Sequence, residues 1–287
     1  MIMLVAGQYH TLTVLRIVPI GAYLDDGAQG ILLPNRFLPR DAKEGDQLRV
    51  FVYHDGEDRL IATTQIPKAV VGEIAYLRVV GANNQGAFAD LGLMKDLFIP
   101  KSQQRQPMHA NGDYFIRVQV DAQTGRMIGT EKITPYLQNE TLTVAERDTV
   151  RLLVYRETQI GFVCIINHVH TGVLHYSDIF QPIREGMILE GHIKKIRQPD
   201  PLHAERGFRL DLAVGKYGGK ARATDAASII LDALADEGGF LPFHDKSDAD
   251  AIYARFAMSK KTFKMTIGNL YRQQRILLED QGIRLVK

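Results

Sequence analysis

The sequence predicts a mainly β protein, built from three small five-stranded barrels in tandem and a C-terminal α+β domain. Three observations indicate this fold class: a recurring segment, short strands separated by regular turn signals, and a change of composition after residue 222. The recurring segment is clearest at 86–101, GAFADLGLMKDLFIPK, with copies at 21–35 and 161–178. It returns about every 65 to 75 residues, which is the size of a whole small domain rather than of a solenoid unit.

The first unit, residues 1–66, is expected to form one barrel. Its β-branched and aromatic residues fall into short runs, separated by Asp-Gly and Glu-Gly-Asp turns. The predicted strands are 11–18, 21–24, 30–33, 48–53 and 60–64. Five short strands with turn signals between them are typical of a small barrel or sandwich.

The second and third units, residues 67–139 and 140–215, repeat this order of strands and turns. In the second unit the predicted strands are 74–80, 86–90, 96–99, 114–120 and 126–130, with a polar loop or short helix at 102–110. In the third they are 148–155, 161–166, 172–175, 188–196 and 208–214, with an extra loop at 198–206 that contains two prolines.

The C-terminal domain, residues 223–287, follows a Gly-rich basic hinge at 216–222. Three helices are predicted there: 226–237 capped by Thr224, 248–258 capped by Ser247, and 260–274 capped by Ser259. Asp250 lies three residues after Ser247, where its side chain can accept a hydrogen bond from the backbone of the cap in a capping box. Residues 275–278 and 283–286 then read as a β-hairpin. Three helices followed by a hairpin is the order of a winged helix.

Units two and three resemble S1 RNA-binding domains, which are five-stranded oligonucleotide-binding barrels. The resemblance rests on GAFADLG with FIPKS, and on GFV with GVLHYSDI and EGMILEG; unit one resembles a degenerate copy. Three such units before a winged helix resemble the conserved virulence factor B (CvfB) family of bacterial RNA-binding regulators over essentially the whole chain. The resemblance implies RNA binding and an influence on gene expression, without enzymatic activity.

Composition places few limits on function. The chain has 45% apolar and 24% charged residues and a net charge of +2, so a basic footprint for nucleic acid must be local. The single cysteine, Cys164, lies in an apolar run and is predicted to be a buried, inert thiol. The first ten residues have no basic flank for a signal peptide, and no run is long enough to cross a membrane. We therefore expect a cytoplasmic protein without a membrane partner.

Aromatic residues that follow a glycine are the first candidates for RNA contact. Tyr23, Phe88 and Phe162 match the S1 aromatic and are predicted to stack on bases, although such rings could equally fill the barrel cores. His175 matches the histidine of the S1 third strand, and Leu33 and Ile99 are taken as its counterparts in the other units. A structural histidine is the alternative for His175.

Cations near the same strands are the second group of candidates. Arg59 and Arg126 follow the turn after strand four, and Lys101 follows strand three of the second unit. Lys195 and Arg197 lie two residues apart on one strand, so they share a face. Each is predicted to contact phosphate, with a solvated barrel surface as the alternative.

The third C-terminal helix carries the strongest charge signal. Between residues 255 and 275 there are six cations and no acid: Arg255, Lys260, Lys261, Lys264, Arg272 and Arg275. Like charges on a helix repel, and lysines in the first turns oppose the helix dipole. The arrangement predicts contact with nucleic acid. A solvated helix face or a contact with another protein is the alternative.

The sequence as a whole predicts a non-enzymatic protein that binds single-stranded RNA and needs no cofactor or metal. His168 and His170 have no third metal ligand at a suitable spacing, and no phosphate-binding loop or nucleophile motif is present. Two alternatives stay open: a DNA-binding transcription regulator that uses the winged helix, and a protein-interaction scaffold.

Overall fold

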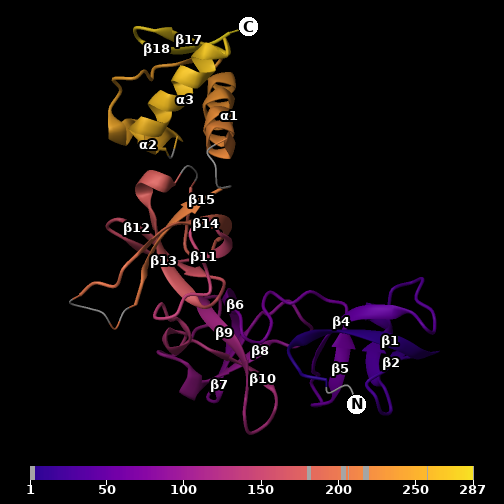
Figure 1. The fold of residues 1–287 in the computed structure, drawn as a ribbon. Coiled ribbons are helices and arrows are strands. Elements are labelled where there is room, and N and C mark those ends of the chain that lie inside the picture. The colour runs from indigo at the N-terminus through magenta and orange to yellow at the C-terminus, as the bar shows by residue number, and fades with distance from the viewer. Residues whose placement is uncertain are drawn as a thin grey trace. The chain divides into compact units, whose positions relative to one another are not determined.

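A computed structural model describes residues 4–179, 182–201, 205, 207–215, 220–256 and 258–286. The chain divides into two compact units, Met1–Pro135 and Tyr136–Lys287. The first unit holds two barrels, and the second holds one barrel and the C-terminal domain (Figure 1). The predicted mainly β fold with a winged helix is confirmed, whereas the four domain boundaries stay predictions.

The first barrel is closed, with strand order β1-β2-β3-β5-β4. Its strands are β1 (Gln8–Val18), β2 (Gly21–Leu24), β3 (Ile31–Pro34), β4 (Gln47–His54) and β5 (Leu60–Thr63). The long strand β1 pairs with both β2 and β4, and its register shifts between Val14 and Arg16. Such a bulge bends a strand, which lets β1 pair with β2 along one edge and with β4 along the other, so that the barrel closes.

The second barrel has the order β10-β9-β6-β7-β8. Its strands are β6 (Ile74–Ala82), β7 (Gly86–Ala89), β8 (Leu97–Pro100), β9 (Asp113–Val120) and β10 (Met127–Thr130). A Cβ atom on Gly129 would lie 2.8 Å from the side chain of Ile99, so glycine lets β10 approach β8. The core of this barrel continues into Phe51, Tyr53 and Ile61 of the first barrel, and the two barrels therefore form one unit.

The third barrel is closed, with the order β11-β12-β13-β15-β14. Its strands are β11 (Thr149–Thr158), β12 (Gly161–Ile166), β13 (His170–His175), β14 (Ile188–Arg197) and β15 (Arg209–Val214). Cys164 is buried in its core, and burial raises the pKa of this thiol to about 12. The predicted burial of this cysteine is therefore confirmed.

The two histidines considered for a metal have separate structural contacts. His170 is fully buried, and its Nδ1 and Nε2 lie 2.7 Å from the Gln138 carbonyl oxygen and 2.8 Å from the Thr143 hydroxyl. It thus fastens the segment before β11 to the barrel. His168 lies in the turn before β13, where its Nε2 is 2.6 Å from Arg151 Nη1.

The C-terminal domain contains three helices and a three-stranded sheet in the order β16-β18-β17. Its elements are α1 (Lys220–Asp236), β16 (Phe240–Leu241), α2 (Ala249–Phe256), α3 (Lys260–Arg272), β17 (Ile276–Glu279) and β18 (Gly282–Leu285). Phe256, Phe263, Ile267 and Leu270 pack in its core. This element order confirms the predicted winged helix.

The helix ends differ from the prediction at two caps. α1 begins at Lys220, so Thr224 lies inside the helix and not at its predicted start. Asp248, not Ser247, caps α2, because its Oδ1 accepts hydrogen bonds from the backbone N–H groups of Asp250 and Ala251 at 2.9 and 3.1 Å. The predicted cap of α3 is confirmed, since Ser259 accepts from Thr262 N at 3.2 Å.

Two predicted segments fall partly outside the described residues. The hinge at 216–222 is described only from Lys220, where it already belongs to α1, and the loop at 198–206 only at 198–201 and 205. The two-residue strand β16 was not predicted, because so short a strand has no alternating pattern to read.

Candidate nucleic-acid interface

Strand pairing defines equivalent positions in the three barrels. In each barrel the glycine that opens the second strand pairs with the last residue of the third strand: Gly21 with Pro34, Gly86 with Pro100, and Gly161 with His175. His175 therefore corresponds to two prolines. The prediction that Leu33 and Ile99 are its counterparts is wrong by one residue.

The same register corrects the role of Phe162. Tyr23 and Phe88 lie two residues after their glycine, whereas Phe162 lies one residue after Gly161. Successive residues of a strand point to opposite faces, so Phe162 takes the inward position and Val163 the outward one. Phe162 is only 6% exposed and belongs to the barrel core. The prediction that Phe162 stacks on a base is therefore wrong.

Each barrel has a pocket on the face that carries the outward positions of its third strand. In the second and third barrels the second strand lines this pocket as well, whereas Tyr23 of the first barrel does not line the pocket there. The pocket of the first barrel is lined by Leu32, Ile61 and Arg59, that of the second by Phe88, Phe98 and Ile128, and that of the third by Val163, Val173 and Leu210. The volumes are about 370, 280 and 440 Å³. This is the face on which barrels of this type bind single strands.

The pocket of the second barrel has paired aromatic walls. Phe88 of β7 and Phe98 of β8 are cross-strand partners, with ring centroids 5.3 Å apart and planes inclined by 39°. Both rings are half-buried. Lys95 and Arg126 line the same pocket. Flat apolar walls with cations beside them are the combination that binds a base and its phosphate.

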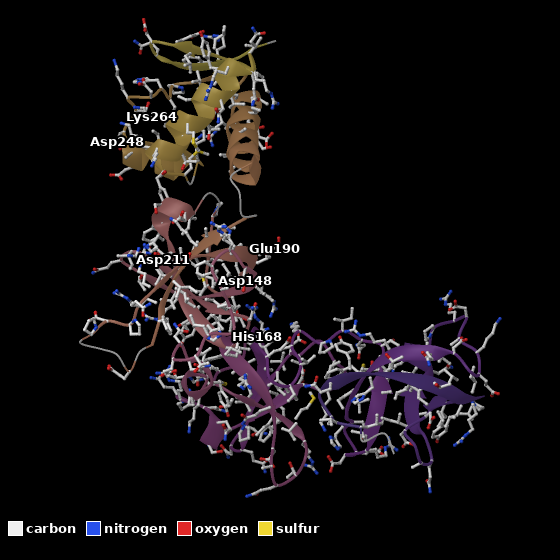
Figure 2. The ribbon with its side chains drawn as sticks, viewed as in Figure 1. Asp148, His168, Glu190, Asp211, Asp248 and Lys264 are labelled. Atoms are coloured by element: carbon white, nitrogen blue, oxygen red, sulfur yellow. The ribbon has the colours of Figure 1, made fainter. Side chains whose placement is uncertain are left out.

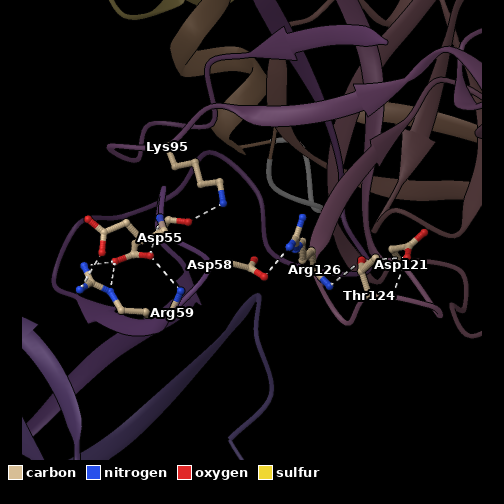
Figure 3. Close-up of polar contacts among 8 residues, drawn as sticks. Asp55, Asp58, Arg59, Lys95, Asp121, Thr124 and Arg126 are labelled. Carbon is tan, nitrogen blue, oxygen red and sulfur yellow. Dashed lines mark hydrogen bonds and ion pairs between the residues drawn. The ribbon is translucent and has the colours of Figure 1, made fainter.

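The two cations of this pocket already contact the β4–β5 turn of the first barrel (Figure 3). Arg126 forms an ion pair with Asp58, and Lys95 Nζ donates to the Asp55 carbonyl oxygen at 2.6 Å. Arg126 and Asp58 are about half exposed, and such a pair contributes only about 0.2–1 kcal/mol. A phosphate can therefore replace the Asp58 carboxylate at little cost.

The candidates in the first barrel are engaged within the barrel. Arg59 contacts Asp55 and Glu57 at 2.8 and 2.9 Å. Burial raises the pKa of Asp55, but hydrogen bonds from Arg59 outweigh this effect and lower it. The Arg16 guanidinium lies 4.2 Å from the centre of the Tyr23 ring and covers one of its faces. The sites predicted here are thus the least available of the three barrels.

In the third barrel, His175 and Arg197 converge on a buried carboxylate of the pocket wall, Asp211, which Figure 2 labels. Arg197 Nε and Nη2 lie 2.8 and 2.7 Å from Asp211 Oδ2, and His175 Nε2 lies 3.4 Å from Oδ1. Burial raises the pKa of Asp211, but the bonds from Arg197 and His175 outweigh it and lower the pKa. Lys195 is exposed, and it has no ion pair among the described residues.

Lys101 is the remaining barrel candidate. It follows β8 directly and opens a short 3-10 helix, Lys101–Gln103. Its side chain is exposed and makes no ion pair within the part of the chain that the structure describes. Like Lys195, it is available for a phosphate.

The lysines of α3 have at most weak acidic partners in the described ranges. Lys261 is exposed and unpaired there, and Lys264 Nζ, labelled in Figure 2, lies 3.9 Å from Asp245 Oδ2. Lys260 Nζ donates to the Lys246 carbonyl oxygen at 3.4 Å. Because Lys261 and Lys264 stand near the positive end of the helix dipole, an anion bound there would relieve an unfavourable charge arrangement.

The arginines around α3 differ in the partners that their side chains contact. Arg255 pairs with Glu237 at 3.2 Å. Arg272 donates to Asn269 Oδ1 at 2.6 Å and to the Gly268 carbonyl oxygen at 3.3 Å, so it stabilises the end of the helix. Arg275 follows the helix and is exposed. The surface predicted to contact nucleic acid is therefore limited to the three lysines of α3 and Arg275.

Several residues of the second-barrel pocket were missed in the sequence, among them Phe98, Lys95, Gln85 and Asp96. Phe98 had a readable signal, since it alternates with the core residues Leu97 and Ile99 and so must point outward. Lys95 and Gln85 lie in turns, where no periodic pattern indicates direction.

Other kinds of site find no support in the described residues. Across these residues, no group of three or more His, Cys, Asp or Glu side chains could hold a metal ion. Among the helices that the structure describes, none combines the length and apolar character needed to cross a membrane.

Comparison with known families agrees with these domains. The S1 domain model matches residues 6–65, the unit that the sequence marks as degenerate, and the CvfB-like winged helix domain model matches residues 228–285. Both are classes of nucleic-acid-binding domain, not of enzymes. The matches support a nucleic-acid-binding protein.

Similar whole proteins include an uncharacterized protein, YitL, from Bacillus subtilis, which is 28% identical over 96% of this chain and 91% of its own length. Conserved virulence factor B from Staphylococcus epidermidis is 28% identical over 86% of this chain and 82% of its own length. A crystal structure of a multidomain protein with nucleic acid binding domains from Streptococcus pneumoniae is 22% identical, with coverage of 98% of both chains and a TM-score of 0.43. The chain carries an S1 domain and a CvfB-like winged-helix domain, which confirms its resemblance to the conserved virulence factor B family.

Proposed function

We propose that the protein is a cytoplasmic regulator of gene expression that binds single-stranded RNA without transforming it. One contact surface is the second-barrel pocket, and the other is the lysine-bearing half of α3. Each surface alone binds weakly. Because one chain carries both, the second contact forms at a high effective concentration once the first is made.

The paired rings of Phe88 and Phe98 support this proposal most directly. They line a pocket of about 280 Å³ with two cations beside them. An unpaired base can stack on an exposed face of these two rings, whereas a base in a duplex is already stacked and paired. The geometry therefore favours a single strand over a duplex.

The winged helix offers little for reading duplex DNA. Asn269 accepts a hydrogen bond from Arg272, and Gln273 and Gln274 lie at and beyond the end of α3. The hairpin that forms the wing carries Glu279 and Asp280 at its turn, and Glu279 binds Arg284 at 2.6 Å. Acids at a wing tip repel the phosphates of a groove. Transcriptional control through duplex DNA is thus the weaker candidate.

Binding of the full chain to a uridine decamer and to a mixed-sequence DNA duplex of equal length, measured across a salt series, tests the proposal. We expect tighter binding to the RNA, and a plot of log affinity against log salt with a slope of about −2 to −3, as for three to four phosphate contacts. A duplex that binds as tightly as the RNA would favour the transcription regulator. The absence of binding to either would favour a protein-interaction scaffold.

A further inference from the structure

We propose that Asp96 makes the second-barrel pocket selective for guanine. This inference rests on the proposed function, because it names the base that the same pocket prefers. Asp96 lies on the turn before β8 and lines the pocket together with Phe88, Phe98 and Gln85.

Asp96 differs from the other acids around this pocket by having no partner. Asp90 binds Lys68 at 2.6 Å and accepts from Gly92 N at 2.8 Å, while Asp58 is paired with Arg126. The Asp96 carboxylate takes part in no hydrogen bond or ion pair with the residues that the structure describes. Asp96 is exposed, and the loss of some hydration together with the nearby Asp90 carboxylate raises its pKa.

An unpaired carboxylate is costly beside an RNA strand, since it repels phosphate and loses part of its hydration. It becomes favourable only where the ligand brings hydrogen-bond donors to both of its oxygens. Stacking on Phe88 and Phe98 places a base with its edge toward the pocket rim, where bases are read by hydrogen bonds. Asp96 is the carboxylate among the residues that line this pocket.

Guanine is the base that matches this acceptor. Its N1–H and N2–H groups are adjacent, parallel donors, which fit the two oxygens of one carboxylate. Adenine and cytosine each offer one amino group beside an acceptor, and uracil offers one N–H between two carbonyl groups, so these bases satisfy the carboxylate less well. The Gln85 side-chain amide, which lines the same pocket, can donate to guanine O6.

Four uridine decamers that differ only at one central base (G, A, C or U) test the inference with the full chain. We expect the strand with guanine to bind about tenfold more tightly than the all-uridine strand, with adenine and cytosine between them. Asp96→Asn should bring the four affinities within about twofold, because an amide cannot accept on both atoms. The same change should leave uridine binding equal or stronger, since it removes a negative charge.

Asp41→Asn is the matched control, because Asp41 is exposed and lines none of the three pockets. It should keep the guanine preference. Equal affinities for the four decamers in the unmodified chain, or a guanine preference that survives Asp96→Asn, would overturn the inference and leave the RNA proposal standing. If no decamer binds at all, both fail. Thermal unfolding of each variant shows whether its fold is intact.

Discussion

Replacing Phe88 by alanine is expected to weaken binding of the full chain to single-stranded RNA by about 5- to 150-fold. The expectation follows from the stacking energy of about 1–3 kcal/mol per base on an aromatic side chain. Phe88 is half-buried against Phe98 and lines the second-barrel pocket, so its removal takes away one wall of that pocket. Fluorescence anisotropy with a labelled decamer measures the change.

Two further variants separate stacking from folding. Phe88→Tyr keeps an aromatic face and should retain most of the affinity. Phe162→Leu changes a ring that is 6% exposed in the third-barrel core, so it should cost about 1 kcal/mol of unfolding free energy and leave RNA affinity unchanged. RNA binding by Phe88→Ala that equals that of the unmodified chain would show that the second-barrel pocket is not the stacking site.

Replacing Lys261 and Lys264 together by glutamine is expected to lower RNA affinity about tenfold at low salt. It should also make the slope of log affinity against log salt shallower by about 1.4, since each phosphate contact to a single strand contributes about 0.7. Both lysines are exposed on α3, and the nearest acid to Lys264 lies 3.9 Å away. A salt titration of the variant beside the unmodified chain measures both quantities.

The control for this pair is Lys43→Gln with Lys132→Gln, which removes the same charge from exposed positions in the first unit. It should leave the slope almost unchanged. The α3 variant should fold at least as stably as the original, because it removes like charges near the helix start. An unchanged slope in the α3 variant would mean that these lysines do not contact the strand.

The barrel architecture was predictable because its signals are local. Short β-branched runs, Gly-Asp turns and the repeat of GAFADLG identify strands within a few residues of their true ends, as at 21–24 and 161–166. The caps show the limit of this approach. Ser247 and Asp248 are adjacent and both are good caps, and only the true helix start at Ala249 decides between them.

The candidate site was less predictable, because a shift of one residue along a strand moves a side chain to the opposite face. Phe162 and Val163 are neighbours, and the strand pairing of Gly161 with His175 is needed to show which of them faces outward. Ion pairs between residues distant in sequence could not be predicted either. Arg126 with Asp58, and Arg197 with Asp211, become pairs only when the strands are assembled.

Ultraviolet crosslinking of the full chain to a single-stranded RNA, followed by mass spectrometry of the attached peptides, tests the central claim most directly. The account predicts crosslinks at Phe88 or Phe98 and in the first turns of α3, and their loss on competition with unlabelled RNA. Crosslinks confined to the other two barrels, with none at the Phe88–Phe98 pair, would contradict it.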